Sequence, residues 1–213
     1  MHKTSPSPWH RTGTRLEKLV GVNETLILPD ILCNYDHLSE EERESYANLF
    51  AAAPLLRDAL EAIRDEIDTL NREFSSYVSR LDFPIKEVLT FIAKRCQSVL
   101  MAVGGKGPQA SPSHWHREGN RLVTASGKEI LPNILNQNLS EEEREANVCL
   151  LVLAPSMRDA IKEILRQIND EKLAQLLATL DSPVKEVLTL SIVPRCQSAL
   201  MACDGKWPNL KEI

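Results

Sequence analysis

The sequence predicts an α+β protein, mainly α, in which each of two tandem repeats joins a small β-hairpin layer to about three helices. Three observations predict this fold class. Residues 5–106 recur, with many substitutions, as residues 111–206; a capping box starts the helical part of each repeat; and apolar residues then follow at alternating spacings of four and three. A repeat of about one hundred residues is a duplicated domain, because solenoid units are shorter and cannot bury a core alone. We therefore expect domains at 1–106 and 107–213, packed as a pseudo-twofold dimer.

A hairpin is predicted near the start of each repeat. In the second repeat, residues 121–125 and 129–131 have strand character, and residues 126–128 between them include the glycine typical of a tight turn. The counterpart in the first repeat spans 15–28, with its turn at 21–24. The proline of each Ile-Leu-Pro segment is expected to end the second strand.

Helices are predicted after each hairpin. Ser39 and Ser140 each precede a glutamate by three residues, which is the pattern of a capping box, so a helix should begin at each serine. Pro54 and Pro155 should interrupt these helices, and each is best placed in the first turn of a second one.

The second helix of the first repeat carries an apolar seam typical of a coiled coil. Its members are Leu56, Leu60, Ile63, Ile67, Leu70, Phe74, Tyr77 and Leu81. The second repeat begins the same seam but loses two residues and meets Asn169 and Asp170, so we expect a break or kink in that helix alone.

A third helix is predicted in both repeats. It opens at 82–84 and at 181–183, where a capping side chain precedes a proline, and it closes near Gly104 and Gly205. Pro194 has no counterpart in the first repeat and should bend the second of these helices in its middle.

Composition excludes several classes of protein. The net charge of −5 disfavours binding to duplex nucleic acid, which depends on phosphate neutralisation. No apolar run approaches the roughly 20 residues of a membrane span, and no segment is typical of a secretory signal, so we expect a cytoplasmic protein with no membrane partner. Five cysteines without a Cys-x-x-Cys pair fit a reducing compartment.

Both repeats resemble a family of small phage and prophage proteins. These open with a His-Thr-Pro-Gly-Pro-Trp-like segment, continue through a hairpin, and carry a helical Glu-Ala-Asn-Ala-Arg-Leu-Ile-Ala-Ala-Ala-Pro-Glu-Leu-Leu stretch. The corresponding segments here are residues 4–9 and 110–115 for the opening, and 44–56 and 145–155 for the helix. The chain departs from the pattern at Tyr46, where asparagine is usual, and at His114, where proline is usual. The resemblance implies a phage accessory protein, which would act in the cytoplasm of an infected bacterium.

Polar residues kept in both repeats are the candidates for ligand binding. Arg95, Gln97 and Ser98 on the predicted third helix return as Arg195, Gln197 and Ser198. Arginine can hold a phosphate or carboxylate through two hydrogen bonds, and glutamine can read a base edge. The alternative is a polar network between helices that fixes how the repeats pack. Cys96 and Cys196 lie on the apolar face of the same helices, where they are expected to be core thiols.

A second candidate group follows the opening of each repeat. It consists of Trp9, His10 and Arg11 in the first repeat and of Trp115, His116 and Arg117 in the second. Tryptophan could stack on a nucleobase while arginine binds its phosphate. The alternative is a tryptophan that anchors the hairpin to a helix.

The sequence favours two functions, neither of them enzymatic. Motifs for nucleotide-dependent or zinc-dependent catalysis are missing, and no cofactor or metal is expected. The leading hypothesis is a phage protein that sequesters a small anionic ligand, such as a cyclic nucleotide immune signal, and so counters host defence. The alternative is an inhibitor or adaptor that binds a host protein through helical surfaces. A polar pocket between the repeats would favour the first, and a broad exposed apolar patch the second. The sequence leaves further homo-oligomerisation open.

Overall fold

The computed structural model describes residues 10–12, 18–20, 26–29, 38–78, 81, 83–103, 115–119, 121–124, 126–131, 139–179 and 182–205. For residues 10–12, 18–20 and 26–29, and for His116, the description covers the backbone only. Within these residues the protein is mainly helical, with two small antiparallel sheets of three strands each. The predicted fold class, mainly α with a small β layer, is confirmed at this level.

Each sheet has one strand more than the predicted hairpin. Strands β1 (His10–Thr12), β2 (Lys18–Val20) and β3 (Leu26–Pro29) pair in that order, as do β4 (Trp115–Glu118), β5 (Arg121–Thr124) and β6 (Glu129–Leu131). The β5–β6 turn contains Gly127 at a φ of +81°, which glycine adopts without steric cost. The pairing of both hairpins is confirmed, whereas the turn predicted at 21–24 lies outside the described residues. The prediction omits β1 and β4 because their polar residues lack the apolar alternation that indicates a strand.

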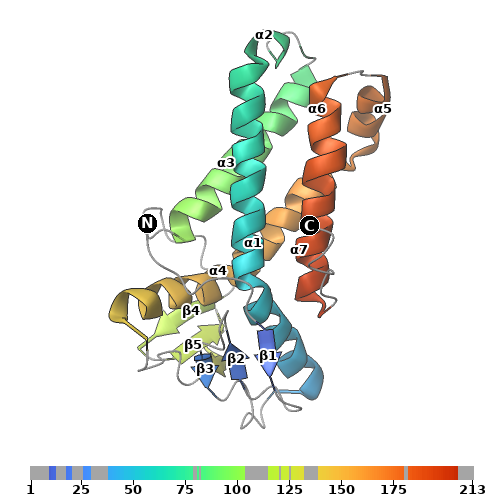
Figure 1. The fold of residues 1–213 in the computed structure, drawn as a ribbon. Coiled ribbons are helices and arrows are strands. Elements are labelled where there is room, and N and C mark those ends of the chain that lie inside the picture. The colour runs from blue at the N-terminus through green and yellow to red at the C-terminus, as the bar shows by residue number, and fades with distance from the viewer. Residues whose placement is uncertain are drawn as a thin grey trace.

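The long helices α1 (Glu40–Glu73) and α4 (Glu141–Ile168) both begin at the predicted capping boxes and both continue through a proline. The prediction that Pro54 and Pro155 interrupt them is therefore wrong. Both prolines are buried, and apolar residues of the core precede and follow each one. Ending the helix there would expose this surface, and its burial offsets the roughly 3 kcal/mol cost of an interior proline. Figure 1 shows α1 changing direction along its length, as an interior proline causes.

The apolar seam of α1 is confirmed as far as Leu70. Its five residues from Leu56 to Leu70 are at most 2% exposed. Beyond it α1 ends at Glu73, and the short helix α2 (Ser75–Val78) follows. The second repeat breaks as predicted, because α4 ends at Ile168 and α5 (Glu171–Thr179) begins after Asp170. The expectation of a break in that repeat alone is wrong, since both repeats have one.

The third helix of the second repeat contains a π-helical turn. In the first repeat α3 (Phe83–Val103) is α-helical throughout, whereas α6 (Pro183–Glu186), η2 (Val187–Ile192) and α7 (Val193–Cys203) follow one another directly. Four residues separate Thr90 from Arg95, but five separate Thr189 from Arg195. A π-helical turn has wider hydrogen-bond spacing and absorbs the additional residue. The predicted disturbance at Pro194 is thus a change of helix type just before the proline.

The helices cross one another above the sheets. Figure 1 shows both sheets at one end of the molecule and α2, α5 and α6 at the other. Helix α1 packs against α3, α4 and α7, and α4 also packs against α3 and α7. Each long helix therefore contacts the third helix of its own repeat and that of the other repeat. The buried side chains of all four helices form one continuous apolar core.

Candidate functional site

Arg195 lies in an ion pair between the repeats. Its Nη2 is 3.1 Å from Oε1 of Glu66 on α1, and its Nε is 3.2 Å from the same oxygen. The hydroxyl of Ser191 also donates a hydrogen bond to this carboxylate. The Arg195 side chain is 42% exposed and that of Glu66 is 24% exposed. The pair holds α7 against α1, which is the packing role that the sequence allowed beside ligand binding.

Arg95 also faces an acidic residue of the other repeat. Its charge helps to lower the pKa of Glu163 on α4, after the larger effects of hydrogen bonds from Arg166 and Gln167. Arg95 is half-buried, and its Nε is buried without a hydrogen-bond partner among the described residues. Each arginine of the repeated motif therefore lies near a glutamate on the long helix of the other repeat.

The remaining residues of the repeated motif divide between surface and core. Gln97, Ser98 and Gln197 are exposed, whereas Ser198 is half-buried. Burial raises the pKa of the Cys96 thiol and of the Cys196 thiol to about 12, and Cys96 itself contributes to the rise at Cys196. The two sulfhydryl groups therefore lie near each other in the core and stay protonated. The prediction that they are core thiols is confirmed.

Trp115 and Arg117 are engaged in packing at the other end of the molecule. The Trp115 ring contacts Tyr46 and Phe50 of α1, with centroid distances of 5.5 Å and 5.3 Å. Arg117 Nη1 donates to both carboxylate oxygens of Glu145 on α4, at 2.8 Å and 2.7 Å. Trp115 thus anchors its sheet to a helix of the first repeat, which is the alternative to base stacking.

Among the side chains that the structure describes, Trp115 and Arg117 do not meet the arginines of the repeated motif. Trp115 contacts Tyr46 while Arg195 contacts Glu66, and these two α1 residues are separated by about 30 Å along the helix path at 1.5 Å per residue. His116 lies in β4, and His10 and Arg11 lie in β1, where only the backbone is described. Trp9 lies outside the described residues.

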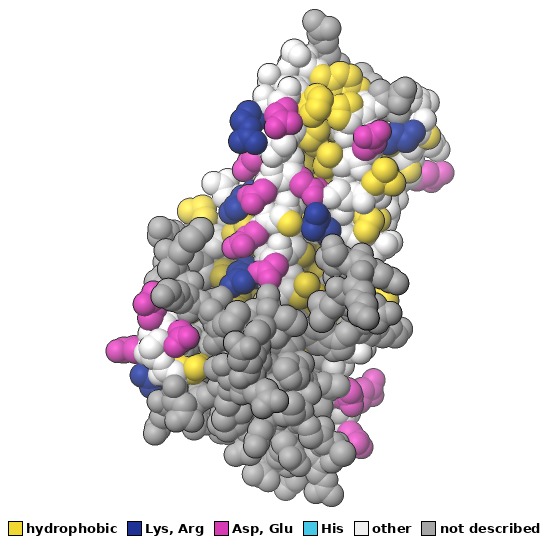
Figure 2. All heavy atoms as spheres, in the orientation of Figure 1, with side chains coloured by type: hydrophobic (Ala, Val, Ile, Leu, Met, Phe, Trp, Pro, Cys, Tyr) yellow, Lys and Arg dark blue, Asp and Glu magenta, His cyan; other side chains and the backbone are white. Residues whose placement is uncertain are grey.

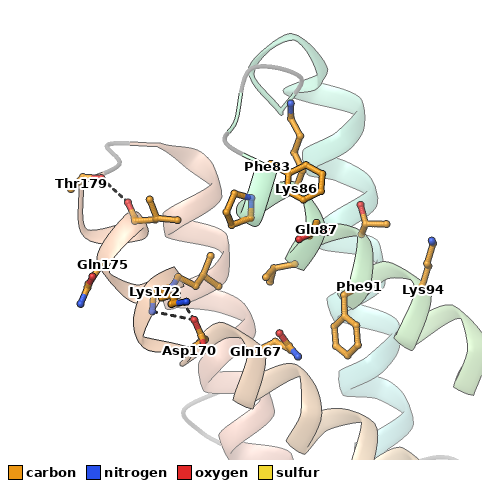
Figure 3. Close-up of a pocket in the computed structure, with 15 residues that line it drawn as sticks. Phe83, Lys86, Glu87, Phe91, Lys94, Gln167, Asp170, Lys172, Gln175 and Thr179 are labelled. Carbon is orange, nitrogen blue, oxygen red and sulfur yellow. Dashed lines mark hydrogen bonds between the residues drawn. The ribbon is translucent and has the colours of Figure 1, made fainter.

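A concave surface of the described part of the chain is a groove between α3 and α5. It has a volume of about 1020 Å³, is open to solvent, and is lined mostly by apolar atoms. Phe83 and Phe91 line the α3 side, and Leu173 and Leu176 line the α5 side. Phe83 is 71% exposed. Figure 3 shows Phe91 of α3 and Gln167 of α4 reaching toward the same part of the groove.

The sequence prediction missed this groove because it depends on how two distant segments meet. The one local signal is the pair Phe83 and Phe91, which lie eight residues apart and so project from neighbouring faces of α3. The groove's other wall, α5, exists only because α4 ends at Ile168. The phenylalanine pair is not kept in the second repeat, where Ser182 and Leu190 take the places of the two residues.

Between α1 and α7, the equivalent position of the first repeat makes polar contacts across the helices. Gln167 follows Arg158 by nine residues, as Glu66 follows Arg57, so the two occupy equivalent positions in the repeats. Gln167 lines the open groove, whereas Glu66 binds Ser191 and Arg195. Ser191 belongs to the π-helical turn. The π-helical turn that absorbs the additional residue of the second repeat therefore supplies one of the contacts to Glu66.

A second cavity offers less support for a binding site. A smaller hollow of about 460 Å³ lies beside the start of α1 and is lined by acidic residues that include Glu40, Glu41 and Asp204. No three His, Cys, Asp or Glu side chains in the described ranges are grouped so that they could hold a metal ion. Figure 2 shows hydrophobic side chains exposed near the end of the molecule where α2 and α6 lie.

These features define a mainly helical protein with a groove between two helices and with arginine–glutamate contacts between its repeats. Comparison of the chain with protein-family models, curated proteins and solved structures finds no match. Among the helices that the structure describes, none combines the length and the apolar character needed to cross a membrane. The function must therefore be inferred from the site itself.

Proposed function

We propose that this protein binds another protein, as an inhibitor or adaptor, and holds an apolar helical segment of that partner in the groove between α3 and α5. The observation that carries the proposal is the groove, with its apolar lining and a volume of about 1020 Å³. Phe83, 71% exposed at its edge, is a large apolar side chain left in water. Exposed apolar surface of this kind typically marks a binding site.

The shape of the groove suits a helix. Its two walls are helices, and an amphipathic helix packs its apolar face into such a depression through side chains at i, i+3, i+4 and i+7. Protein binding through helical surfaces is the second of the two functions that the sequence favours. The structure supports it over ligand capture, because Arg195 is already paired with Glu66.

The proposal includes a pseudo-twofold arrangement of the two repeats. The contact of α1 with α7 has a reciprocal contact of α4 with α3. The pair of Arg195 with Glu66 likewise has a counterpart in the proximity of Arg95 to Glu163. These reciprocal contacts support a covalent imitation of a homodimer whose two sides have diverged.

Sequestration of a small anionic ligand, such as a cyclic nucleotide signal in a phage-infected cell, is the second candidate. Its support is that Arg95 Nε and Ser198 Oγ are buried without a hydrogen-bond partner among the described residues. A panel of cyclic di- and trinucleotides tests it through the melting temperature, which a bound ligand raises. Replacing Arg95 and Arg195 by alanine should abolish any such rise; a rise that survives in the folded variant excludes this site.

Site-specific photocrosslinking tests the protein-binding function. A benzophenone amino acid replaces Phe83 in the groove, and a matched variant carries it at Leu190, which is 74% exposed and lies on η2 outside the groove. In the native host cell, Phe83 should give a discrete adduct that Leu190 does not give. Adding Leu176→Ser in the groove should reduce the Phe83 adduct. Equal labelling from both positions would refute the proposed site.

A further inference from the structure

We propose that the segment held in the groove is an acidic amphipathic helix of about three turns. This inference rests on the proposed protein-binding function and names the chemistry of its partner. Two features of the groove carry it: the spacing of its aromatic residues, and the position of its lysines.

The length of the α3 wall and the spacing of its two aromatic residues set the length of the partner segment. Phe83 and Lys94 mark the ends of the α3 wall. They are about 16 Å apart at a rise of 1.5 Å per residue, which matches about three helical turns of a partner. Phe83 and Phe91 are about 12 Å apart on the same basis. Side chains at i and i+7 of a helix are separated by nearly this distance, so two apolar anchors of one partner helix can reach both rings.

Lysines on both walls set the charge of the partner segment. Lys86 and Lys94 line the groove from α3, and Lys172 lines it from α5, against Glu87 and Asp170. The groove lining therefore carries a net charge of +1 (three lysines minus two acidic residues), on a chain whose net charge is −5. Figure 3 shows that Lys94 and Lys172 come from opposite walls.

One of the two acidic residues of the groove, Asp170, already accepts hydrogen bonds within the protein. Asp170 Oδ1 accepts hydrogen bonds from the backbone N–H groups of Lys172 and Leu173, at 3.1 Å and 3.3 Å. Its charge is thus directed at the start of α5, where it favours the helix. Lys94 and Lys172 are exposed at the rim. An apolar stripe flanked by glutamates would match the floor and both rims, whereas lysine flanks would meet like charge.

Binding of synthetic helical peptides to the full chain tests the inference. The probes are fluorescein-labelled peptides of about 14 residues with leucine at i, i+3, i+4 and i+7. One has glutamate at the flanking positions, and a second has lysine there. A third keeps the glutamates but has serine in place of leucine. The protein variants are Lys94→Glu combined with Lys172→Glu, and Phe83→Ser. Lys162→Glu, an exposed lysine of α4 outside the groove, is the matched control.

The inference predicts that the glutamate-flanked leucine peptide binds at least about tenfold more tightly than the lysine-flanked one, and that salt reduces this difference. The double lysine variant should weaken its binding about tenfold, with Lys162→Glu unchanged. If both leucine peptides bind equally and the Phe83→Ser variant binds neither, the inference that the partner helix is acidic is wrong, while the proposed protein-binding function remains. Failure of both leucine peptides to bind, or binding that Phe83→Ser does not change, would overturn the proposed function as well.

Discussion

Replacing Trp115 by alanine distinguishes a packing role of this ring from a ligand-binding role. The ring is half-buried and contacts Tyr46 and Phe50 at 5.5 Å and 5.3 Å. About two thirds of the roughly 200 Å² that a tryptophan buries, at about 25 cal/mol per Å², amounts to about 3 kcal/mol. Favourable ring geometry adds about 1 kcal/mol. The alanine variant should therefore lose about 4 kcal/mol of unfolding free energy.

Urea unfolding followed by circular dichroism measures this loss. Trp115→Phe retains a ring and should lose only about 1 kcal/mol. Glu118→Ala, an exposed residue of the same strand, should lose less than about 0.5 kcal/mol. A double-mutant cycle with Tyr46→Ala should give a coupling energy of about 1 kcal/mol, because the two rings are in edge-to-face contact. A loss below about 0.5 kcal/mol in Trp115→Ala would refute the anchoring role and return the ring to the ligand hypothesis.

Three further predictions concern charges and thiols. Arg195→Ala should lose about 0.5 to 1 kcal/mol in urea unfolding, since its pair with Glu66 is partly exposed, and an unchanged midpoint would mean that the pair contributes nothing. The hydrogen bond from Lys128, and next that from the Ser39 backbone, holds the pKa of Glu42 below its usual 4.5; this contribution to stability is present above pH 4.5 and is lost as pH falls through the folded pKa. Lys128→Ala should raise that pKa in an NMR titration, and an unmoved titration contradicts the contact. Burial raises the pKa of the Cys196 thiol from 9.0 to about 12, so the contribution of this thiol to folding stability is present below pH 9 and is lost as pH rises toward 12. Labelling of Cys196 with a thiol reagent at pH 8 should therefore be slow unless urea unfolds the protein.

Elements determined by neighbouring residues could be predicted from the sequence. The capping boxes at Ser39 and Ser140, the turn at Gly127 and the break after Ile168 each depend on interactions within a few residues. The buried seam from Leu56 to Leu70 follows from helical periodicity alone. These features needed no knowledge of the tertiary structure.

Elements determined by distant contacts could not be predicted in the same way. Pro54 lies inside α1 because the core on both sides of it favours a continuous helix over the local preference of proline. The partners of Arg195 and Trp115 come from the other repeat, so the sequence could give their alternatives but not choose between them. The π-helical turn is an intermediate case. Alignment of the repeats reveals the additional residue between Thr189 and Arg195, but it does not reveal that a π-helical turn accommodates this residue.

Joining both repeats in one polypeptide changes how the contact surfaces of the molecule can evolve. In a homodimer every substitution appears twice, so a change that improves one face is imposed on its symmetry mate. Here Glu66 and Gln167 occupy equivalent positions, yet Glu66 accepts a hydrogen bond from Ser191 while Gln167 lines an open groove. Each surface can therefore change alone. A binding surface can therefore arise on one side of the molecule without an identical copy on the symmetry-related side, which a symmetric dimer cannot achieve.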